Sequence, residues 1–162
     1  MLTEQDLLDF LDSNNLPYTR IEHPAVFTCA EAEQHRPAQP TVSTKNLFLC
    51  DKKARRFLLV VTACEKTMDL LKLGQQTGIP HLRFASEENL ERMLGVTRGS
   101  VTMLGLANDR THQVELWVDA EIWTEPLFQS HPLVNTATLL LTRETLLRFF
   151  QLTGHQPQLL QV

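Results

Sequence analysis

The sequence predicts a mixed α+β fold, in which a mostly antiparallel central sheet is flanked by helices. Two observations favour this class. Short β-rich runs and amphipathic helical stretches are interleaved irregularly, without the regular strand–helix alternation of a parallel α/β protein. In the centre, residues 46–50 and 57–63 predict a hairpin across a basic turn at 51–54. The second of these runs begins with five consecutive apolar residues, which is typical of a strand buried on both faces.

Caps and breakers define the elements before the hairpin. Thr3 and Asp6 resemble the start of a helix whose leucines share one face, and residues 14–17 end it because the residue before a proline avoids the α region. Thr28 and Glu31 repeat that capping pattern. The predicted elements of this half are a helix after Thr3, a strand at 18–22, a helix from Thr28 to about residue 35, and an irregular connection containing Pro37 and Pro40.

The same signals continue after the hairpin, where glycines follow the predicted helices. The predicted elements of this half are a helix at 68–76 stopped by Gly78, a helix at 87–94 between Ser86 and Gly95, a strand at 114–118 near the sheet surface, a buried strand at 137–141, and a helix from Thr142 to Gly154 with Leu146, Leu147 and Phe150 on its buried face.

Length and charge limit the class of protein. A chain of 162 residues fits one domain, which we place at residues 1–162, and 43% hydrophobic residues is typical of a globular protein. A net charge of −4 argues against binding nucleic acid by bulk charge, although a local basic patch remains possible. No apolar run is long enough to cross a bilayer, and the acidic N-terminal stretch does not resemble a secretory signal. We therefore expect a cytoplasmic protein that has no membrane partner.

The cysteines and histidines indicate neither a metal site nor a cysteine nucleophile. Cys29, Cys50 and Cys64 are an odd, widely spaced set without a CxxC pair, so we expect reduced thiols. The six histidines show no ligand spacing, and the common nucleotide-binding, metalloprotease and serine-hydrolase motifs are absent. We expect no metal and no cofactor.

Three segments combine residue types that favour a binding cleft. Residues 43–49 place Lys45 and Asn46 at the mouth of an apolar strand, where a cation can hold a phosphate or carboxylate or simply remain solvated. Residues 99–105 enclose small and hydroxylated residues between glycines, as in a connecting loop or in a loop that approaches a substrate closely. In residues 130–136, a proline holds His131 extended. Taken alone, these patterns indicate only an α+β domain that has a cleft.

Read together, the three segments resemble one family. TKNLFLCDKK at 44–53, LGVTRGSVT at 94–102 and HPLVNTAT at 131–138 are similar to motifs of the YbaK/prolyl-tRNA-synthetase-associated domain family, and most of all to its free-standing alanyl-tRNA(Pro) deacylases. The resemblance covers about residues 3–152. It implies the family's fold and the hydrolysis of the ester between a wrong amino acid and the 3′-terminal adenosine of tRNA(Pro), by substrate-assisted catalysis and without a cofactor.

The resemblance also implies the site residues. Lys45 matches the family's lysine, Asn46 the polar position beside it, Gly99 the start of a GxxxP loop, and His131 the histidine of HPLVN. The sequence departs from the family at Met103, where the loop usually has proline; methionine is longer and more flexible, and we expect its bulk to help set the pocket size. The remaining positions implied to bind substrate are Thr44, Phe48, Ser100, Val101, Thr102, Met103, Pro132, Leu133 and Asn135.

The implied partners are mischarged tRNA(Pro) and prolyl-tRNA synthetase, and we expect no DNA partner. The side chains expected to contact tRNA phosphates are Lys52, Lys53, Arg55, Arg83 and Arg98. Two alternatives stay open. One is a deacylase for another mischarged species, cysteinyl- or seryl-tRNA. The other is a non-catalytic module that binds tRNA or a synthetase.

Overall fold

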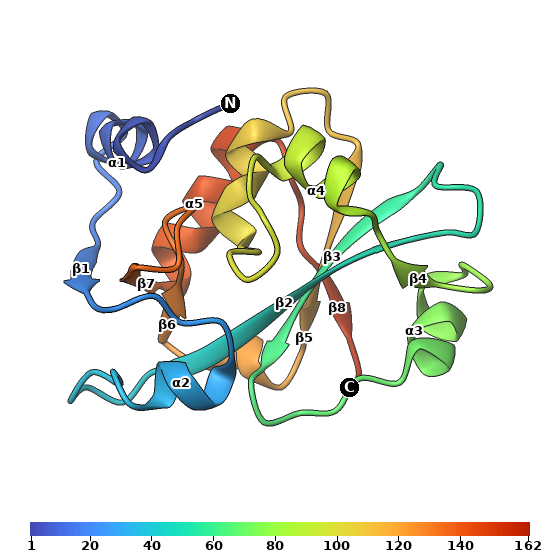
Figure 1. The fold of residues 1–162 in the computed structure, drawn as a ribbon, viewed down its shortest axis with the longest axis horizontal. Coiled ribbons are helices and arrows are strands. Elements are labelled where there is room, and N and C mark those ends of the chain that lie inside the picture. Colours follow the sequence, from blue (N-terminus) through green and yellow to red (C-terminus); the bar gives the residue numbers. More distant parts are fainter.

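The structure is a computed structural model that describes all 162 residues (Figure 1). Its helices are α1 (Glu4–Ser13), α2 (Cys29–Glu33), α3 (Leu70–Thr77), α4 (Glu87–Leu94) and α5 (Arg143–Thr153), with short 3-10 helices η1 (Met103–Asn108) and η2 (Ile122–Thr124). Its strands are β1 (Thr19–Glu22), β2 (Val42–Cys50), β3 (Phe57–Ala63), β4 (Arg83–Phe84), β5 (Val114–Asp119), β6 (Leu127–Ser130), β7 (Ala137–Thr142) and β8 (Gln158–Leu160).

The strands form one mixed sheet in the order β1-β7-β6-β2-β3-β5-β8, with β4 paired to β2. Four of the seven strand pairings are antiparallel and three are parallel. The predicted fold class, a mostly antiparallel sheet flanked by helices, is confirmed. None of the helices has the length and apolar character needed to cross a membrane.

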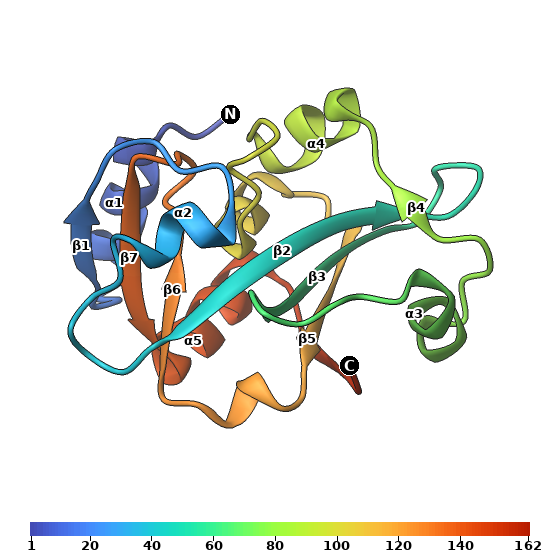
Figure 2. The same ribbon diagram turned by 60° about the horizontal axis from the view of Figure 1, so that its bottom comes forward.

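Strand β2 connects the two halves of this sheet, as Figure 2 shows. Its first residues pair in parallel with β6, the last partners being Ser43 and Gln129. From Thr44 onward β2 pairs with β3 alone, until Leu49 and Cys50 also pair with β4. Lys45 and Asn46 therefore lie just beyond the point where β6 leaves β2. Side chains and loops, rather than a neighbouring strand, occupy that side of β2.

Helices cover both faces of the sheet. Leu59 and Val61 of β3 belong to a core of 27 buried residues that also contains residues of α1, α4 and α5. Leu58 and Val60, which alternate with them, belong to a smaller core of seven residues together with Leu73 of α3. Every residue of β3 is buried, which confirms the prediction from its apolar run.

Two details of the predicted elements are wrong. Strand β5 lies inside the sheet between β3 and β8 rather than near the sheet surface, and its Glu115 pairs with Arg56 at 2.7 Å. In α5, Leu147 is 36% exposed, while Phe149 is buried beside Leu146 and Phe150.

A buried acid–histidine pair holds the turn before β5. The carboxylate of Asp109 accepts hydrogen bonds from the backbone N–H groups of Gln113 and Val114, at 3.0 and 2.8 Å, and lies 2.9 Å from Nε2 of His155. Burial by itself would raise the pKa of Asp109, but the hydrogen bonds from His155, Gln113 and Val114 outweigh it and lower the pKa. Asp109 therefore stabilises the fold as a carboxylate.

Replacing Asp109 by asparagine is expected to lower the free energy of unfolding by about 3 kcal/mol at pH 7, because the amide loses the charge on which these donors converge. The folded pKa is lowered, so this stabilisation is present at neutral pH and is lost as the pH falls below about 4. Urea denaturation at pH 7 and near pH 3 measures both effects, with the exposed Asp9→Asn as control. Equal midpoints for wild type and Asp109→Asn at pH 7 would contradict this assignment.

Candidate functional site

A pocket of about 230 Å³ opens beside β2, next to the point where β6 leaves it. It brings together residues from all three segments that the sequence singled out. It also includes residues of α2 and of the segment before it, where no sequence motif indicated a function. The lining residues are Val26, Phe27, Thr28, Cys29, Ala32, Thr44, Lys45, Asn46, Cys64, Gly99, Val101 and His131.

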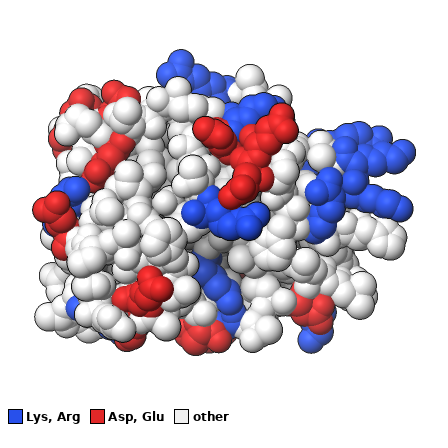
Figure 3. Space-filling view, in the orientation of Figure 1, with Lys and Arg blue, Asp and Glu red and all other residues white.

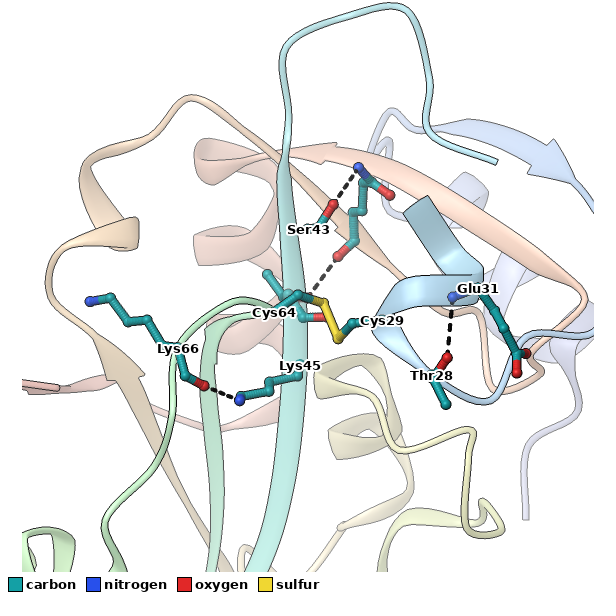
Figure 4. Close-up of a disulfide and its surroundings, with 9 residues drawn as sticks. Thr28, Cys29, Glu31, Ser43, Lys45, Cys64 and Lys66 are labelled. Atoms are coloured by element: carbon teal, nitrogen blue, oxygen red, sulfur yellow. Dashed lines mark hydrogen bonds between the residues drawn. A yellow bond between two sulfur atoms is a disulfide. The ribbon is translucent and has the colours of Figure 1, made fainter. Parts of the chain in front are cut away.

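Lys45 supplies the positive charge of this pocket. Its ammonium contacts the backbone carbonyl oxygen of Lys66, which lies just after β3 (Figure 4). Lys45 forms no ion pair, since no carboxylate lies within 4.0 Å of its nitrogen. A carbonyl oxygen offsets part of the cost of desolvating the ammonium but leaves its charge uncompensated. The lysine is therefore able to attract an anionic group.

Asn46 presents a polar atom that the protein does not satisfy. Its side-chain oxygen Oδ1 is buried and has no hydrogen-bond partner. Leaving such an acceptor unpaired costs about 1–3 kcal/mol, so a donor that reaches it from the pocket would stabilise the site. A ligand's ammonium or hydroxyl group would satisfy it.

His131 is held in one tautomer at the pocket wall. Its Nδ1 lies 3.1 Å from the carbonyl oxygen of Ala137, which can only accept, so Nδ1 carries the proton and Nε2 is the acceptor. Burial lowers the pKa of His131, the hydrogen bond to Ala137 opposes that shift, and nearby His23 lowers the pKa further. The imidazole is consequently neutral at neutral pH. It can orient a ligand or a water molecule but contributes no positive charge.

The loop at 99–101 offers backbone donors. Gly99 has φ of +90°, which L side chains rarely adopt, and a Cβ there would lie 3.0 Å from the Phe27 ring. The N–H groups of Gly99 and Val101 donate to no acceptor within the protein, while the N–H of Ser100 closes a turn onto Thr97. Two unpaired N–H groups beside a pocket can bind an oxygen that gains negative charge.

The segment Val26–Cys29 forms the side of the pocket opposite β2. Val26 is fixed by two hydrogen bonds with Asn135, since it donates its N–H to the Asn135 carbonyl and accepts from Asn135 Nδ2 at 3.0 Å. Thr28 caps α2 by accepting from the N–H of Glu31, as predicted. Phe27 is 67% exposed at the mouth. The Thr28 cap predicts this helix, but no local sequence pattern predicts that it packs beside β2.

Cys29 and Cys64 form a disulfide in the pocket wall (Figure 4), so the prediction of reduced thiols is wrong for these two residues. They are 35 residues apart in the chain, and the fold brings their Cα atoms to 5.8 Å. That separation matches no spacing motif, so the pairing could not be predicted from the sequence. Cys50 is free and buried, and burial raises the pKa of its thiol. The disulfide ties α2 to the end of β3.

Reducing this disulfide is expected to lower the free energy of unfolding by about 4 kcal/mol, the loop-closure value for a loop of this length. Thermal unfolding with and without a dithiol reductant measures the effect. The reductant should shift wild type to lower temperature and leave a Cys29→Ser/Cys64→Ser variant unchanged. An identical midpoint for wild type in both conditions would contradict a stabilising disulfide.

Several residues that the resemblance assigned to substrate binding lie away from the pocket. Phe48 is 4% exposed and stacks on Phe57, and Met103 is 1% exposed in the larger core. We therefore correct the expectation that Phe48 and Met103 contact the substrate, and with it the expectation that Met103 sets the pocket size. The other predicted residues that are buried and absent from the pocket lining are Ser100, Thr102, Pro132 and Leu133.

Thr102 instead connects two pocket segments. Its hydroxyl donates to the His131 carbonyl at 2.7 Å and lies 2.9 Å from the Ser130 hydroxyl. Thr102 therefore fixes the loop after Gly99 against the segment that carries His131. Asn135, which holds Val26, has a similar indirect role. Both residues hold pocket-lining segments in place without lining the pocket themselves.

Four of the predicted basic residues gather at the β2–β3 turn, and we call Lys52, Lys53, Arg55 and Arg83 the hairpin patch. Arg83 joins the turn because β4 pairs with the end of β2, Arg83 being opposite Cys50. All four side chains are exposed, and basic side chains gather over this part of the molecule in Figure 3. The end of β2 at Cys50, opposite Arg83, lies about 17 Å from Lys45, since five residues of strand rise roughly 3.3 Å each.

The charges of the patch are mostly unpaired. Lys52, Lys53 and Arg83 form no ion pair, and Arg55 lies 3.8 Å from Asp51. Arg98 stands apart from the patch, beside the pocket loop, and lies 3.6 Å from Glu87. The hairpin patch is therefore the larger surface on which phosphates could bind.

Comparison with known proteins agrees with this architecture. The aminoacyl-tRNA editing domain matches residues 23–149. The chain is 39% identical over 158 residues to the zebrafish (Danio rerio) prolyl-tRNA synthetase associated domain-containing protein 1, covering 96% of this chain and 85% of that protein. It is 35% identical over 155 residues to the prolyl-tRNA editing protein ProX of Acetoanaerobium sticklandii, covering 96% of this chain and 94% of ProX.

A solved structure given as a candidate trans-editing enzyme for prolyl tRNA synthetase has the same fold, with a TM-score of 0.72. The match covers 100% of this chain and 99% of the other at 21% sequence identity. At that identity the likeness concerns the fold alone.

Proposed function

The chain belongs to the aminoacyl-tRNA editing domain family, and we propose that it hydrolyses mischarged alanyl-tRNA(Pro) in trans. A synthetase pocket built for proline rejects alanine poorly, because each methylene changes binding by only about 1–3 kcal/mol. A second site that accepts only the smaller amino acid corrects the error. The volume of about 230 Å³ is below the roughly 300–1,000 Å³ of typical small-molecule sites, which favours a small aminoacyl group.

Each unsatisfied group of the pocket has a role in this reaction. Lys45 holds the phosphate of the terminal nucleotide, because its ammonium has no acidic partner in the protein. Asn46 Oδ1 accepts a hydrogen bond from the α-amino group of the aminoacyl ester. The N–H groups of Gly99 and Val101 bind the ester carbonyl oxygen as it gains negative charge. Donors of this kind contribute about 3–4 kcal/mol each in other hydrolases.

The nucleophile in this scheme is water. Water adds to the ester carbonyl carbon, the tetrahedral intermediate collapses, and the bond to the ribose oxygen breaks. The products are the free amino acid and a tRNA with an intact terminal hydroxyl. The neighbouring ribose hydroxyl of the substrate positions or activates the water, since the pocket holds no serine, cysteine or lysine paired with a base. His131, neutral and fixed by Ala137, orients the bound ester.

The hairpin patch contacts the phosphates of the acceptor stem. Its separation of about 17 Å from Lys45 along β2 fits a substrate whose unpaired 3′ end enters the pocket while the paired stem remains outside. Association through these few exposed side chains should weaken with salt, with a slope of about −0.7 to −0.9 per phosphate contact.

The observation that carries the proposal is the convergence of an unpaired ammonium, an unpartnered amide oxygen and two free N–H groups on one small pocket. Single-turnover deacylation of alanyl-tRNA(Pro) tests it, with cysteinyl- and seryl-tRNA as parallel substrates. We expect alanyl-tRNA(Pro) to be cleaved fastest. Faster cleavage of another species would reassign the substrate. Binding of aminoacyl-tRNA without rate enhancement would indicate the non-catalytic module.

A further inference from the structure

The position of Lys45 depends on a residue outside the pocket. Its ammonium contacts a single protein group, the backbone carbonyl of Lys66, as the close-up in Figure 4 shows. Lys66 follows β3 by three residues, and its N–H donates to the Ala63 carbonyl in a turn. A lysine side chain is long and flexible, so where its ammonium rests depends on how firmly that carbonyl is held.

The side chain of Lys66 fixes this turn. Its ammonium lies 2.8 Å from Asp119 Oδ2 and 2.5 Å from Glu121 Oε2. The hydrogen bonds with Asp119 and then Glu121 raise the pKa of Lys66, so it remains charged. The Asp119 side chain is 1% exposed and that of Glu121 is 75% exposed. The buried pair with Asp119 is therefore the stronger anchor, because water screens the exposed one.

Asp119 is itself fixed from two sides. Its Oδ2 accepts from the hydroxyl of Thr62 at 2.7 Å, and its Oδ1 accepts from the N–H of Glu121 at 3.0 Å. Thr62 is fully buried on β3 and stands opposite Lys45 in the β2–β3 pairing. Neither Asp119 nor Lys66 lines the pocket. The contacts form a continuous path from the end of β5, through Lys66, to the ammonium of Lys45.

We propose that Lys66 and Asp119 are positioning residues for Lys45, a role that rests on the proposed function of that lysine. The buried carboxylate holds the Lys66 side chain, the anchored turn holds the carbonyl, and the carbonyl holds the Lys45 ammonium where the terminal phosphate arrives. Without the anchor the ammonium samples other rotamers, and part of the binding energy is spent on ordering it. Lys66 and Asp119 thus act on the substrate only through Lys45.

A double-mutant cycle tests this dependence. Lys66→Met removes the ion pair but keeps the carbonyl, and we expect it to lower the single-turnover deacylation rate about fivefold at subsaturating protein. Lys66→Arg keeps the ion pair and should stay within about twofold of wild type. In a Lys45→Ala background, Lys66→Met should change the rate no further. Lys72→Met, an exposed lysine of α3 without an ion pair, is the matched control.

The cycle separates positioning from general destabilisation. A fivefold loss that persists in the Lys45→Ala background would show that Lys66 acts independently of Lys45 and would overturn the proposal, as would a wild-type rate for Lys66→Met. A wild-type rate for Lys45→Ala itself would remove the proposed role of Lys45 and this inference with it. An additive cycle on top of a slow Lys45→Ala rejects the positioning role alone.

Asp119→Asn provides a second route to the same answer. The amide keeps one oxygen, which can still accept from the Glu121 N–H, but its NH2 group then faces Thr62 and Lys66, and the negative charge toward Lys66 is lost. It should reproduce the loss seen with Lys66→Met and, like it, have no effect in the Lys45→Ala background. Thermal unfolding of each variant verifies that the rates are measured on folded protein. If Lys66→Met loses activity while folded Asp119→Asn keeps the wild-type rate, the buried carboxylate is not the anchor and the proposal fails.

Discussion

Replacing Lys45 by alanine is expected to lower the rate of alanyl-tRNA(Pro) deacylation at least tenfold while the protein remains folded. The lysine is the only cationic side chain among the pocket residues, because His131 is neutral, and it has no carboxylate partner. Its removal leaves the terminal phosphate without a counter-charge and the ester less firmly placed. Single-turnover kinetics measures the loss, and urea denaturation verifies that the fold is intact.

Lys72→Ala is the control for this prediction, because it removes an exposed lysine that lies outside the pocket. Its rate should equal that of wild type. If Lys45→Ala also deacylates at the wild-type rate, the assignment of this lysine to the site is wrong.

Replacing Gly99 by valine is expected to abolish deacylation. At φ of +90° any side chain is strained, and its Cβ would press on the Phe27 ring at 3.0 Å, at the pocket mouth. The N–H groups of Gly99 and Val101, which we propose bind the ester oxygen, would shift with the loop. We expect the rate to fall to the uncatalysed level, measured with alanyl-tRNA(Pro) in single turnover.

Gly78→Val separates crowding of the pocket from backbone strain. Gly78 ends α3 at φ of +72°, so the same substitution is strained there too, but nothing lies within 4 Å of its Cβ position. Both variants should lose stability, and only Gly99→Val should lose activity. A folded Gly99→Val protein with the wild-type rate would show that this loop does not line the active site.

Much of the fold could be predicted because its signals are local. Thr28, Ser86 and Thr142 each accept a hydrogen bond from an N–H three residues on, and the helices begin where these caps indicate. Gly78 and Gly154 adopt the left-handed conformation that ends a helix. Such caps involve neighbours in sequence, so a single sequence contains them.

The missing features depend on contacts between distant residues. The disulfide of Cys29 and Cys64 joins residues with no spacing motif, and only the completed sheet brings α2 to the end of β3. Leu147 and Phe149 both lie near the predicted buried face of α5, and packing against neighbouring elements decides which is exposed.

Part of the candidate site could be predicted because some motif residues line the pocket themselves. Three distant segments supply four residues that line the same pocket: Lys45, Asn46, Gly99 and His131. Adjacency within a motif is a weaker guide. Met103 is only four residues from Gly99, yet η1 begins at Met103 and turns its side chain into the core. Membership in a motif therefore does not imply contact with substrate.

The most direct test of the proposed function compares deacylation of alanyl-tRNA(Pro) and prolyl-tRNA(Pro) by the wild-type protein under single-turnover conditions. A pocket that selects by size should cleave the alanyl ester and spare the prolyl ester by at least tenfold, since proline adds two carbons at about 1–3 kcal/mol each. Equal rates on the two substrates, or rates no faster than spontaneous hydrolysis, would contradict the proposal.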